Sequence, residues 1–306
     1  YTGQIAMKII PMTEIFCDID DFYGEFKDNL PKNLLPSSEE ADFPLAMPPC
    51  VLSPSEMMTL VVIFHLSHYR TFKHFYRHVR QYWSHEFPHL VSYERFVALQ
   101  AYLLIPLCVY LNTRKGRVTG IAFIDSTSLV VCHNRRIHSN RVFKDFAKRG
   151  KNSIGWFFGF KLHLIINDEG ELLAFKLTPA NTDDRTPVPE MTRGIWGKLF
   201  GDKGYLSQPL FDLLFNQVLQ LITKIKKNMK NKLMPLTDKI LLRKRALIET
   251  VNDQLKNISQ IEHTRHRSLT GFMLNLLGGL VAYTYQDKKP SLNLNTTADR
   301  MLPVVV

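Results

Sequence analysis

The spacing of apolar side chains predicts that the first third of the chain is helical. Apolar residues recur every three or four positions within residues 12–26 and again within residues 69–83, which is the period of an amphipathic helix. Residues 57–66 are almost wholly apolar, as is typical of a helix buried on all sides. Residues 93–105 predict a fourth helix, which Pro106 is expected to stop or kink.

Two polar segments mark the predicted domain organisation. Residues 31–54 contain six prolines together with serines and acids, so we expect a linker or an extended loop, with Ser53 or Ser55 capping the next helix. A polar, basic connector at residues 111–118 marks the boundary between domains. The predicted parts are an N-terminal all-helical domain at 1–115, a second domain at 116–288 and a loosely ordered tail at 289–306.

After residue 116 the pattern changes to the short apolar runs of strands. A first strand leads to Asp125, and strand-like residues continue to Cys132. An Asn-Asp-Glu-Gly turn then joins two alternating segments, which predicts an antiparallel hairpin. The other predicted elements are the hairpin strands 156–167 and 171–177, a helix near 187–193, a strand at 198–200, a helix from Ser207 to Gln217, a strand at 219–225 and a long basic helix at 237–257. This order predicts an α/β domain with a ribonuclease-H-like mixed sheet flanked by helices.

Three acids stand in contexts that favour chemistry. Asp125 lies at the end of an apolar strand, where a carboxylate costs free energy unless it is paired, hydrogen-bonded or bound to metal. Asp202 follows the short strand at 198–200, and Glu249 lies on the basic helix. If the two strands pair in parallel, Asp125 and Asp202 lie side by side. Three such carboxylates can hold divalent ions over a phosphodiester, although each acid alone has an ordinary interpretation as a cap, a turn or a surface ion pair.

The formal net charge of +11 and the pI of about 9.4 indicate an anionic partner, with nucleic acid first and an acidic membrane surface second. Many of the cations crowd the approach to Glu249, which favours a DNA track over a merely solvated face. The basic face of the helix at residues 70–80 has two equally favoured interpretations, a DNA-binding surface and an ordinary solvated surface. Lys203, beside Asp202, is a candidate contact for the scissile phosphate. His163 is expected to be a surface histidine rather than a ligand of DNA or metal. The candidate DNA-binding residues are Lys203, Lys226, Lys227, Arg243, Lys244, Arg245, Lys256, Arg265 and Arg267.

Cysteine usage and hydropathy indicate a cytoplasmic protein. The four cysteines are far apart and form no C-x-x-C pair, so neither a zinc knuckle nor a disulfide framework is expected. The N-terminus has no signal-peptide pattern. The apolar segment 269–285 is shorter than the roughly 20 residues of a membrane span, and we expect it to be a buried helix.

Three sequence blocks carry a family resemblance. They are Ile124-Asp125-Ser126-Thr127, Gly201-Asp202-Lys203-Gly204-Tyr205, and Arg245 with Glu249 and Lys256. Together they resemble the Asp-Asp-Glu (DDE) transposases of bacterial insertion sequences. More narrowly, residues 10–285 resemble the insertion-sequence family numbered nine-eighty-two. Leu242 stands where the wider group often has a tyrosine.

The resemblance implies a DNA transposase that cuts at terminal inverted repeats and joins the freed 3′-hydroxyl ends to target DNA. It implies Mg²⁺ as cofactor with Mn²⁺ as substitute, and Asp125, Asp202 and Glu249 as metal ligands and catalytic residues. Arg245 and Lys256 would hold DNA or position the helix. The partners would be double-stranded DNA and a second copy of the chain when two ends are synapsed. A standalone metal-dependent nuclease and a non-catalytic DNA-binding protein are the alternatives.

Overall fold

The chain forms two compact units. The computed structural model describes residues 12–29, 47–224, 233–262, 266–292 and 294. One unit comprises Tyr1–Arg114, Leu255–Ile261 and His266–Asp287, and the other comprises Lys115–Gln254, Glu262–Arg265 and Lys288–Val306. Most of the predicted linker and tail lie outside the described residues.

The first unit is helical, as the apolar spacing predicts. Its elements are α1 (Met12–Asp28), α2 (Pro54–Leu66), α3 (Phe72–Tyr82), α4 (Tyr93–Leu99), the 3₁₀ turn η1 (Gln100–Leu103), α5 (Leu104–Thr113) and α10 (Leu269–Thr284). Ser53 caps α2 and forms a reciprocal capping box with Glu56, which confirms one of the two predicted caps. Met57 to Phe64 are all buried, so the prediction of a helix enclosed on all sides is also confirmed.

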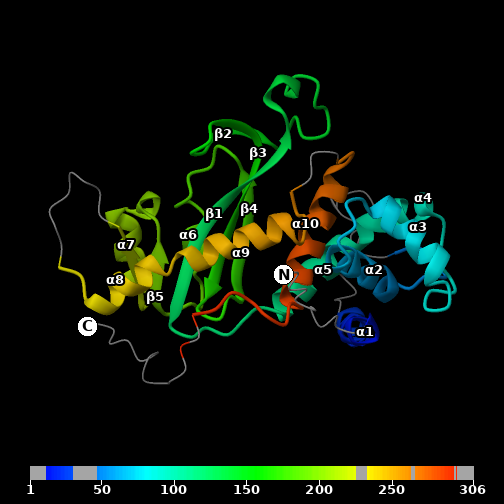
Figure 1. Cartoon of the computed structure of the whole chain (residues 1–306), viewed down its shortest axis with the longest axis horizontal. Helices are drawn as coiled ribbons and strands as arrows, with labels where there is room; N and C mark the ends of the chain where they lie inside the picture. Colours follow the sequence, from blue (N-terminus) through cyan, green and yellow to red (C-terminus); the bar gives the residue numbers. More distant parts are fainter. Residues whose placement is uncertain (1–11, 30–46, 225–232, 263–265, 293, 295–306) are drawn as a thin grey trace, which may run out of the picture. The chain divides into compact units, whose positions relative to one another are not determined.

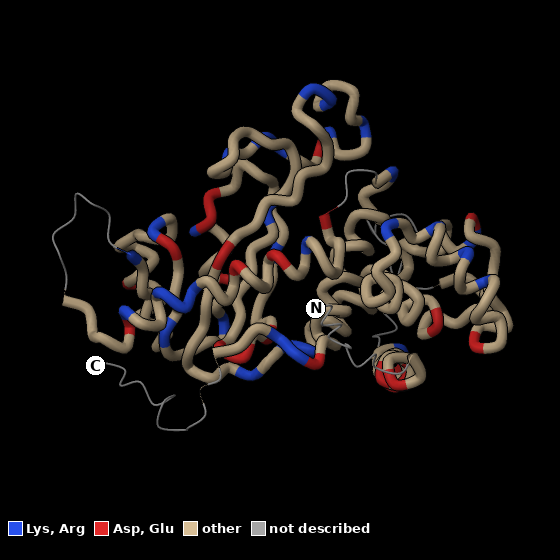
Figure 2. The backbone as a smooth tube through the Cα atoms, in the orientation of Figure 1, with Lys and Arg blue, Asp and Glu red and all other residues tan. Residues whose placement is uncertain are grey.

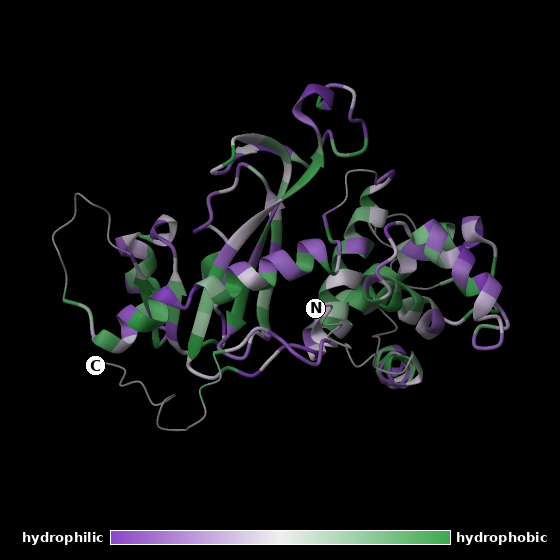
Figure 3. Ribbon diagram, viewed as in Figure 1, coloured by the Kyte–Doolittle hydropathy of each residue, from purple (hydrophilic) through white to green (hydrophobic). Residues whose placement is uncertain are grey.

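Helix α10 packs against α2 and α5, although the sequence pattern placed it in the second domain. Gly278 and Gly279 explain the close approach. A Cβ at Gly278 would lie 2.6 Å from a side-chain carbon of Val61, and one at Gly279 would lie 2.4 Å from a side-chain carbon of Ile261. The helix is therefore a core element of the helical unit, as expected from its apolar composition (Figure 3).

The prediction that Pro106 ends or kinks a helix is wrong. The turn η1 interrupts the helix first, and α5 then begins at Leu104. Pro106 therefore lies in the first helical turn, where a missing N–H leaves no hydrogen bond unmade. The whole segment Tyr93–Thr113 is long and apolar enough to cross a membrane by length and composition. The 3₁₀ interruption and the burial of apolar side chains such as Phe96 and Leu107 mark it as a core segment.

The second unit contains a mixed six-stranded sheet. Its strands are β1 (Ile121–Cys132), β2 (Lys148–Lys151), β3 (Trp156–Asn167), β4 (Leu172–Pro179), β5 (Gly197–Gly201) and β6 (Leu219–Thr223). The order is β2-β3-β1-β5-β6, with β4 also paired to β3. Strands β1 to β4 pair antiparallel, and β5 pairs parallel with both β1 and β6. The predicted ribonuclease-H-like mixed sheet is confirmed.

Helices cover both faces of this sheet. Short helices α6 (Val188–Met191) and α7 (Gln208–Phe215) pack on one face, in a core that includes Ile124 and Leu199. Successive strand residues point to opposite faces. Contacts from α8 (Leu236–Arg243) to Lys198 and from α9 (Ala246–Asn257) to Asp125 therefore place these helices on the other face, and Figure 1 shows α9 lying across the strands.

Two sequence expectations need correction here. Asp125 does not end a strand, because β1 continues as one strand for seven more residues to Cys132. The predicted single helix at 237–257 is two helices separated at Lys244 and Arg245. Neither glycine nor proline marks this break, so helical spacing alone does not reveal it.

Candidate active site

Strand pairing brings Asp125 and Asp202 to the same place. In the parallel register of β1 and β5, Phe123 lies opposite Phe200. Asp125 and Asp202 each follow two residues later, so the same register carried two residues further places them side by side. The parallel pairing that the sequence argument required is therefore present.

Helix α9 brings Glu249 to the same site through Arg245. The Arg245 guanidinium lies 3.4 Å from Asp125 Oδ1 and also forms an ion pair with the Glu249 carboxylate. Asn252, one turn further along α9, donates a hydrogen bond of 3.0 Å to Asp125 Oδ2. Both oxygens of the Asp125 carboxylate thus accept hydrogen bonds from residues that lie about 120 positions later in the sequence.

Burial dominates the electrostatics of Asp125. Desolvation raises its pKa from 3.8 to about 6, because a buried carboxylate is less stable when charged. Arg245 and the Ser126 backbone N–H act in the opposite direction, whereas the negative charges of Asp202 and Glu249 raise the pKa further. The three acids are therefore close enough to repel one another electrostatically.

The turn after β5 holds Asp202 in place. Its Oδ1 accepts a hydrogen bond of 2.6 Å from the Gly204 N–H and so caps the short 3₁₀ turn η3 (Lys203–Tyr205). A Cβ at position 204 would lie 2.8 Å from the same oxygen, so a larger residue there would displace the Asp202 carboxylate. Tyr205 is buried, and burial raises its pKa well above the usual range. Lys203 is exposed beside Asp202.

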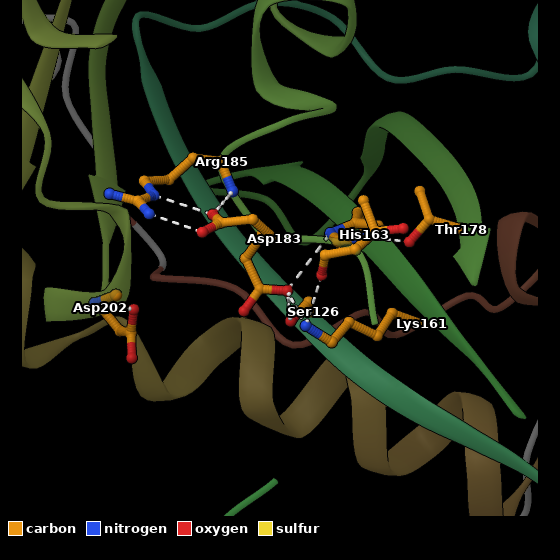
Figure 4. Close-up of polar contacts among 10 residues, drawn as sticks. Ser126, Lys161, His163, Thr178, Asp183, Arg185 and Asp202 are labelled. Carbon is orange, nitrogen blue, oxygen red and sulfur yellow. Dashed lines mark hydrogen bonds and ion pairs between the residues drawn. The ribbon is translucent and has the colours of Figure 1, made fainter. Parts of the chain in front are cut away.

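A second polar cluster on β1, which includes Asp184, was not predicted from the sequence. Asp184 Oδ1 accepts hydrogen bonds from Ser126 Oγ at 3.0 Å and Lys161 Nζ at 2.9 Å, and Lys161 also donates to the Thr182 carbonyl at 2.8 Å. Figure 4 shows Ser126 of β1 and Lys161 of β3 close together in this cluster. The available signal was an acid pair, Asp183-Asp184, in the loop that follows the predicted strand at 171–177. This cluster anchors the residue next to Asp125.

The prediction of a surface histidine at 163 is wrong. His163 is fully buried, and its Nε2 lies 2.8 Å from Thr178 Oγ1 (Figure 4). Its Nδ1 is 4.0 Å from Asp184 Oδ1. Burial lowers its pKa to about 4, so the ring is neutral near pH 7. Strand β3 is buried on both faces, which is why alternation along it did not identify an exposed side.

The candidate DNA-binding residues fall into three groups. Arg243 and Lys244 are exposed in the bend between α8 and α9, next to Arg245, and Lys203 is exposed beside Asp202. Lys256 and Arg267 belong to the helical unit. The remaining candidates, Lys226, Lys227 and Arg265, lie outside the described residues. Figure 2 shows how Lys and Arg are distributed along the described chain.

The donor chemistry of the three acids suits Mg²⁺, which prefers hard carboxylate oxygens and retains several waters. A divalent ion would also offset the mutual repulsion that raises the Asp125 pKa. In the described part of the chain, no three His, Cys, Asp or Glu side chains are close enough to hold one ion together. Here Arg245 supplies the positive charge between Asp125 and Glu249.

Comparison with known proteins identifies a family. A family model described as a transposase DDE domain matches residues 115–269, just over half of the 306-residue chain. The matched segment includes Asp125, Asp202 and Glu249. A comparison with curated proteins finds no match. Transposases with this domain generally depend on divalent metal. The narrower resemblance, to the insertion-sequence family numbered nine-eighty-two, stays a prediction.

Proposed function

This chain belongs to the transposase DDE-domain family, and on that premise we propose that it cuts DNA at the terminal inverted repeats of an insertion sequence and joins the 3′-hydroxyl ends to target DNA. In general terms it is a DNA transposase of the nucleotidyl-transferase type. The finer proposal is supported by the parallel register of β1 and β5, which leads to Asp125 and Asp202, and by Arg245, which forms ion pairs with both Asp125 and Glu249.

Each acid has a distinct support in the proposed site. Asp125 and Asp202 project from neighbouring parallel strands, and Glu249 comes from the first turn of α9. These residues would hold Mg²⁺, or Mn²⁺ in its place. Bound metal would supply an activated attacking oxygen and stabilisation of the leaving oxygen. Arg245 and Asn252 would fix the orientation of the Asp125 carboxylate through their hydrogen bonds to it. The same contacts link α9 to β1.

Positive charge around the acids supports DNA as the partner. Lys203, Arg243 and Lys244 are exposed close in sequence to the three site residues, and phosphate neutralisation supplies most of the non-specific affinity of proteins for DNA. We assign the helical unit to binding of the element ends, to dimerisation or to both. Dimerisation is expected because synapsis of two ends requires at least two catalytic sites. The cytoplasm is the proposed location.

Cleavage of labelled element ends in Mg²⁺ tests the proposal. We expect Asp202→Asn to lower the single-turnover rate by about 10³-fold or more, roughly 4 kcal/mol of transition-state stabilisation. Asp212→Asn is the matched control, since Asp212 is exposed on α7 and its carboxylate accepts a hydrogen bond from Gln208. A rate for Asp202→Asn within tenfold of the control would refute the assignment of Asp202.

Two further outcomes separate the alternatives. A standalone nuclease would cut the ends but would not join pre-cut 3′-hydroxyl ends to a target plasmid. A non-catalytic DNA-binding protein would bind the ends equally well with EDTA and would show no turnover in Mg²⁺ or Mn²⁺.

A further inference from the structure

A strongly basic segment lies between β1 and β3. We call residues 133–156 the basic lobe. It contains one acid, Asp145, and seven cations: Arg135, Arg136, Arg141, Lys144, Lys148, Arg149 and Lys151. All seven cations are exposed. The lobe protrudes beyond the sheet at the end of β1 (Figures 1 and 2).

None of the seven cations forms an ion pair with any residue that the structure describes. Like charges gathered at this density create a positive potential that attracts anions, although solvent keeps the cost of the exposed cations to the fold small. Some acids of the same unit already pair with other cations, for example Asp184 with Lys161 and Asp238 with Lys198. An anionic partner outside the chain would complement the charge of the lobe.

The lobe is a folded surface and not an open loop. Strand β2 pairs antiparallel with β3 along four residues. Phe143 is buried and packs edge-to-face on Phe160, with ring centroids 5.9 Å apart. Asn152 accepts hydrogen bonds of 3.0 Å from the N–H groups of Ile154 and Gly155 and so closes the β2–β3 turn. The cations are consequently presented on a preformed scaffold.

Trp156 adds an aromatic platform to this positive surface. Its side chain is 57% exposed, and Arg149 and Lys151 lie 5.6 Å and 5.9 Å from its ring centroid. An exposed indole flanked by cations can stack on a nucleobase while the cations contact the phosphates. Exposed tryptophans beside cations also occur at membrane surfaces, but the match to a transposase DDE domain favours nucleic acid for this chain.

We propose that the basic lobe binds the DNA substrate away from the cleavage point, with its cations on the phosphates and Trp156 stacked on an unpaired base. This inference rests on the proposed function, because it takes the scissile phosphate to lie at Asp125. Strand β1 joins Asp125 to Cys132, so the lobe begins seven residues from the carboxylate. At about 3.3 Å per residue this is roughly 23 Å. At about 3.4 Å per base pair, a duplex running along β1 meets the lobe about seven base pairs from the cut.

Salt-dependent binding tests the lobe without requiring cleavage. The probe is a fluorescent duplex carrying an element end, and every protein carries Asp202→Asn so that the DNA stays intact. The lobe variant is Arg135→Gln/Arg136→Gln/Arg149→Gln. The matched control removes three exposed cations near the opposite end of β1: Lys115→Gln/Arg117→Gln/Arg193→Gln. We expect the lobe variant alone to reduce the slope of log affinity against log salt concentration by about 2–3, near 0.9 for each lost phosphate contact.

Phosphate ethylation interference locates the contact. We expect ethylation of phosphates about seven base pairs from the cut to inhibit binding by the parent and to have no effect on binding by the lobe variant. Trp156→Ala should leave the salt slope unchanged and weaken binding of an end with an unpaired base at that position by about 5- to 100-fold. Trp156→Phe should retain most of the affinity.

Several results would overturn the inference. One is a salt slope that falls as much in the control variant as in the lobe variant, and another is a salt slope that the lobe variant leaves unchanged. A third is a lobe variant that loses affinity for an RNA duplex or for anionic vesicles but not for DNA. The proposed function can fail separately, because it depends on cleavage by a chain with Asp202 restored. A lobe effect combined with Asp202-independent cleavage would refute the function but not the DNA surface.

Discussion

The carboxylate site and the basic lobe both adjoin β1, yet they differ in whether their charged side chains have partners within the chain. At the site, Asp125 and Glu249 share the guanidinium of Arg245, and Asn252 satisfies the remaining oxygen of Asp125. In the lobe, seven exposed cations have no ion-pair partner among the described residues, and only Trp156 lies under two of them. Charges at the site are compensated within the chain, whereas those in the lobe are not.

This difference distinguishes charged side chains that stabilise the fold from charged side chains that are available to bind another molecule. A partly buried carboxylate must be compensated internally, because desolvation makes an isolated charge costly. An exposed cation is solvated and can remain unpaired at little cost. The two regions should therefore respond differently to neutralisation, and three predictions test this contrast.

The largest effect on stability is expected at the most buried ion pair. Lys198 on β5 and Asp238 on α8 are 2.8 Å apart, with side chains only 3% and 4% exposed. Lys198→Met leaves Asp238 charged and buried, and should lower the free energy of unfolding by about 3–5 kcal/mol. Urea denaturation of the single variants and of Lys198→Met/Asp238→Leu would measure the coupling. A double variant destabilised by the sum of the two single losses would show that the pair is not energetically coupled.

A smaller effect is expected at the shared guanidinium of the site. Arg245→Lys keeps the charge but loses the planar fork that reaches Asp125 and Glu249 together. We expect the single-turnover cleavage rate to fall by about 10- to 100-fold, which corresponds to roughly 1.4–2.8 kcal/mol. Arg243→Lys, at an exposed neighbouring position, is the control. Equal rates in the two variants would show that Arg245 acts only as a charge.

The smallest effect on stability is expected in the lobe. Neutralising Arg135, Arg136 and Arg149 to Gln should change the free energy of unfolding by no more than about 0.5 kcal/mol. Any change should be stabilising at low salt, since like charges are removed. The same urea titration measures it. A loss above about 2 kcal/mol would mean that the lobe cations maintain the fold, and the contrast with the site would disappear.

Local patterns in the sequence were sufficient for the type of most elements and for the candidate acids. Helical spacing predicted α1 and α3, an almost wholly apolar run predicted α2, and the Asn-Asp-Glu-Gly turn predicted the β3–β4 hairpin. Each of these features depends on residues a few positions apart, so a short window of sequence contains the physical cause. The proline rule failed at Pro106, because the interruption that accommodates it occurs several residues earlier.

By itself, the sequence determined the period of each segment, the net positive charge and the acids available for chemistry. Only the tertiary structure decided that β1 and β5 pair in a register that aligns Asp125 with Asp202, that Arg245 joins Asp125 to Glu249, and that His163 is buried. It also decided which cations have partners and which do not. These outcomes depend on contacts between segments up to about 120 residues apart, and the energy of such contacts depends on register and burial, which no local pattern encodes.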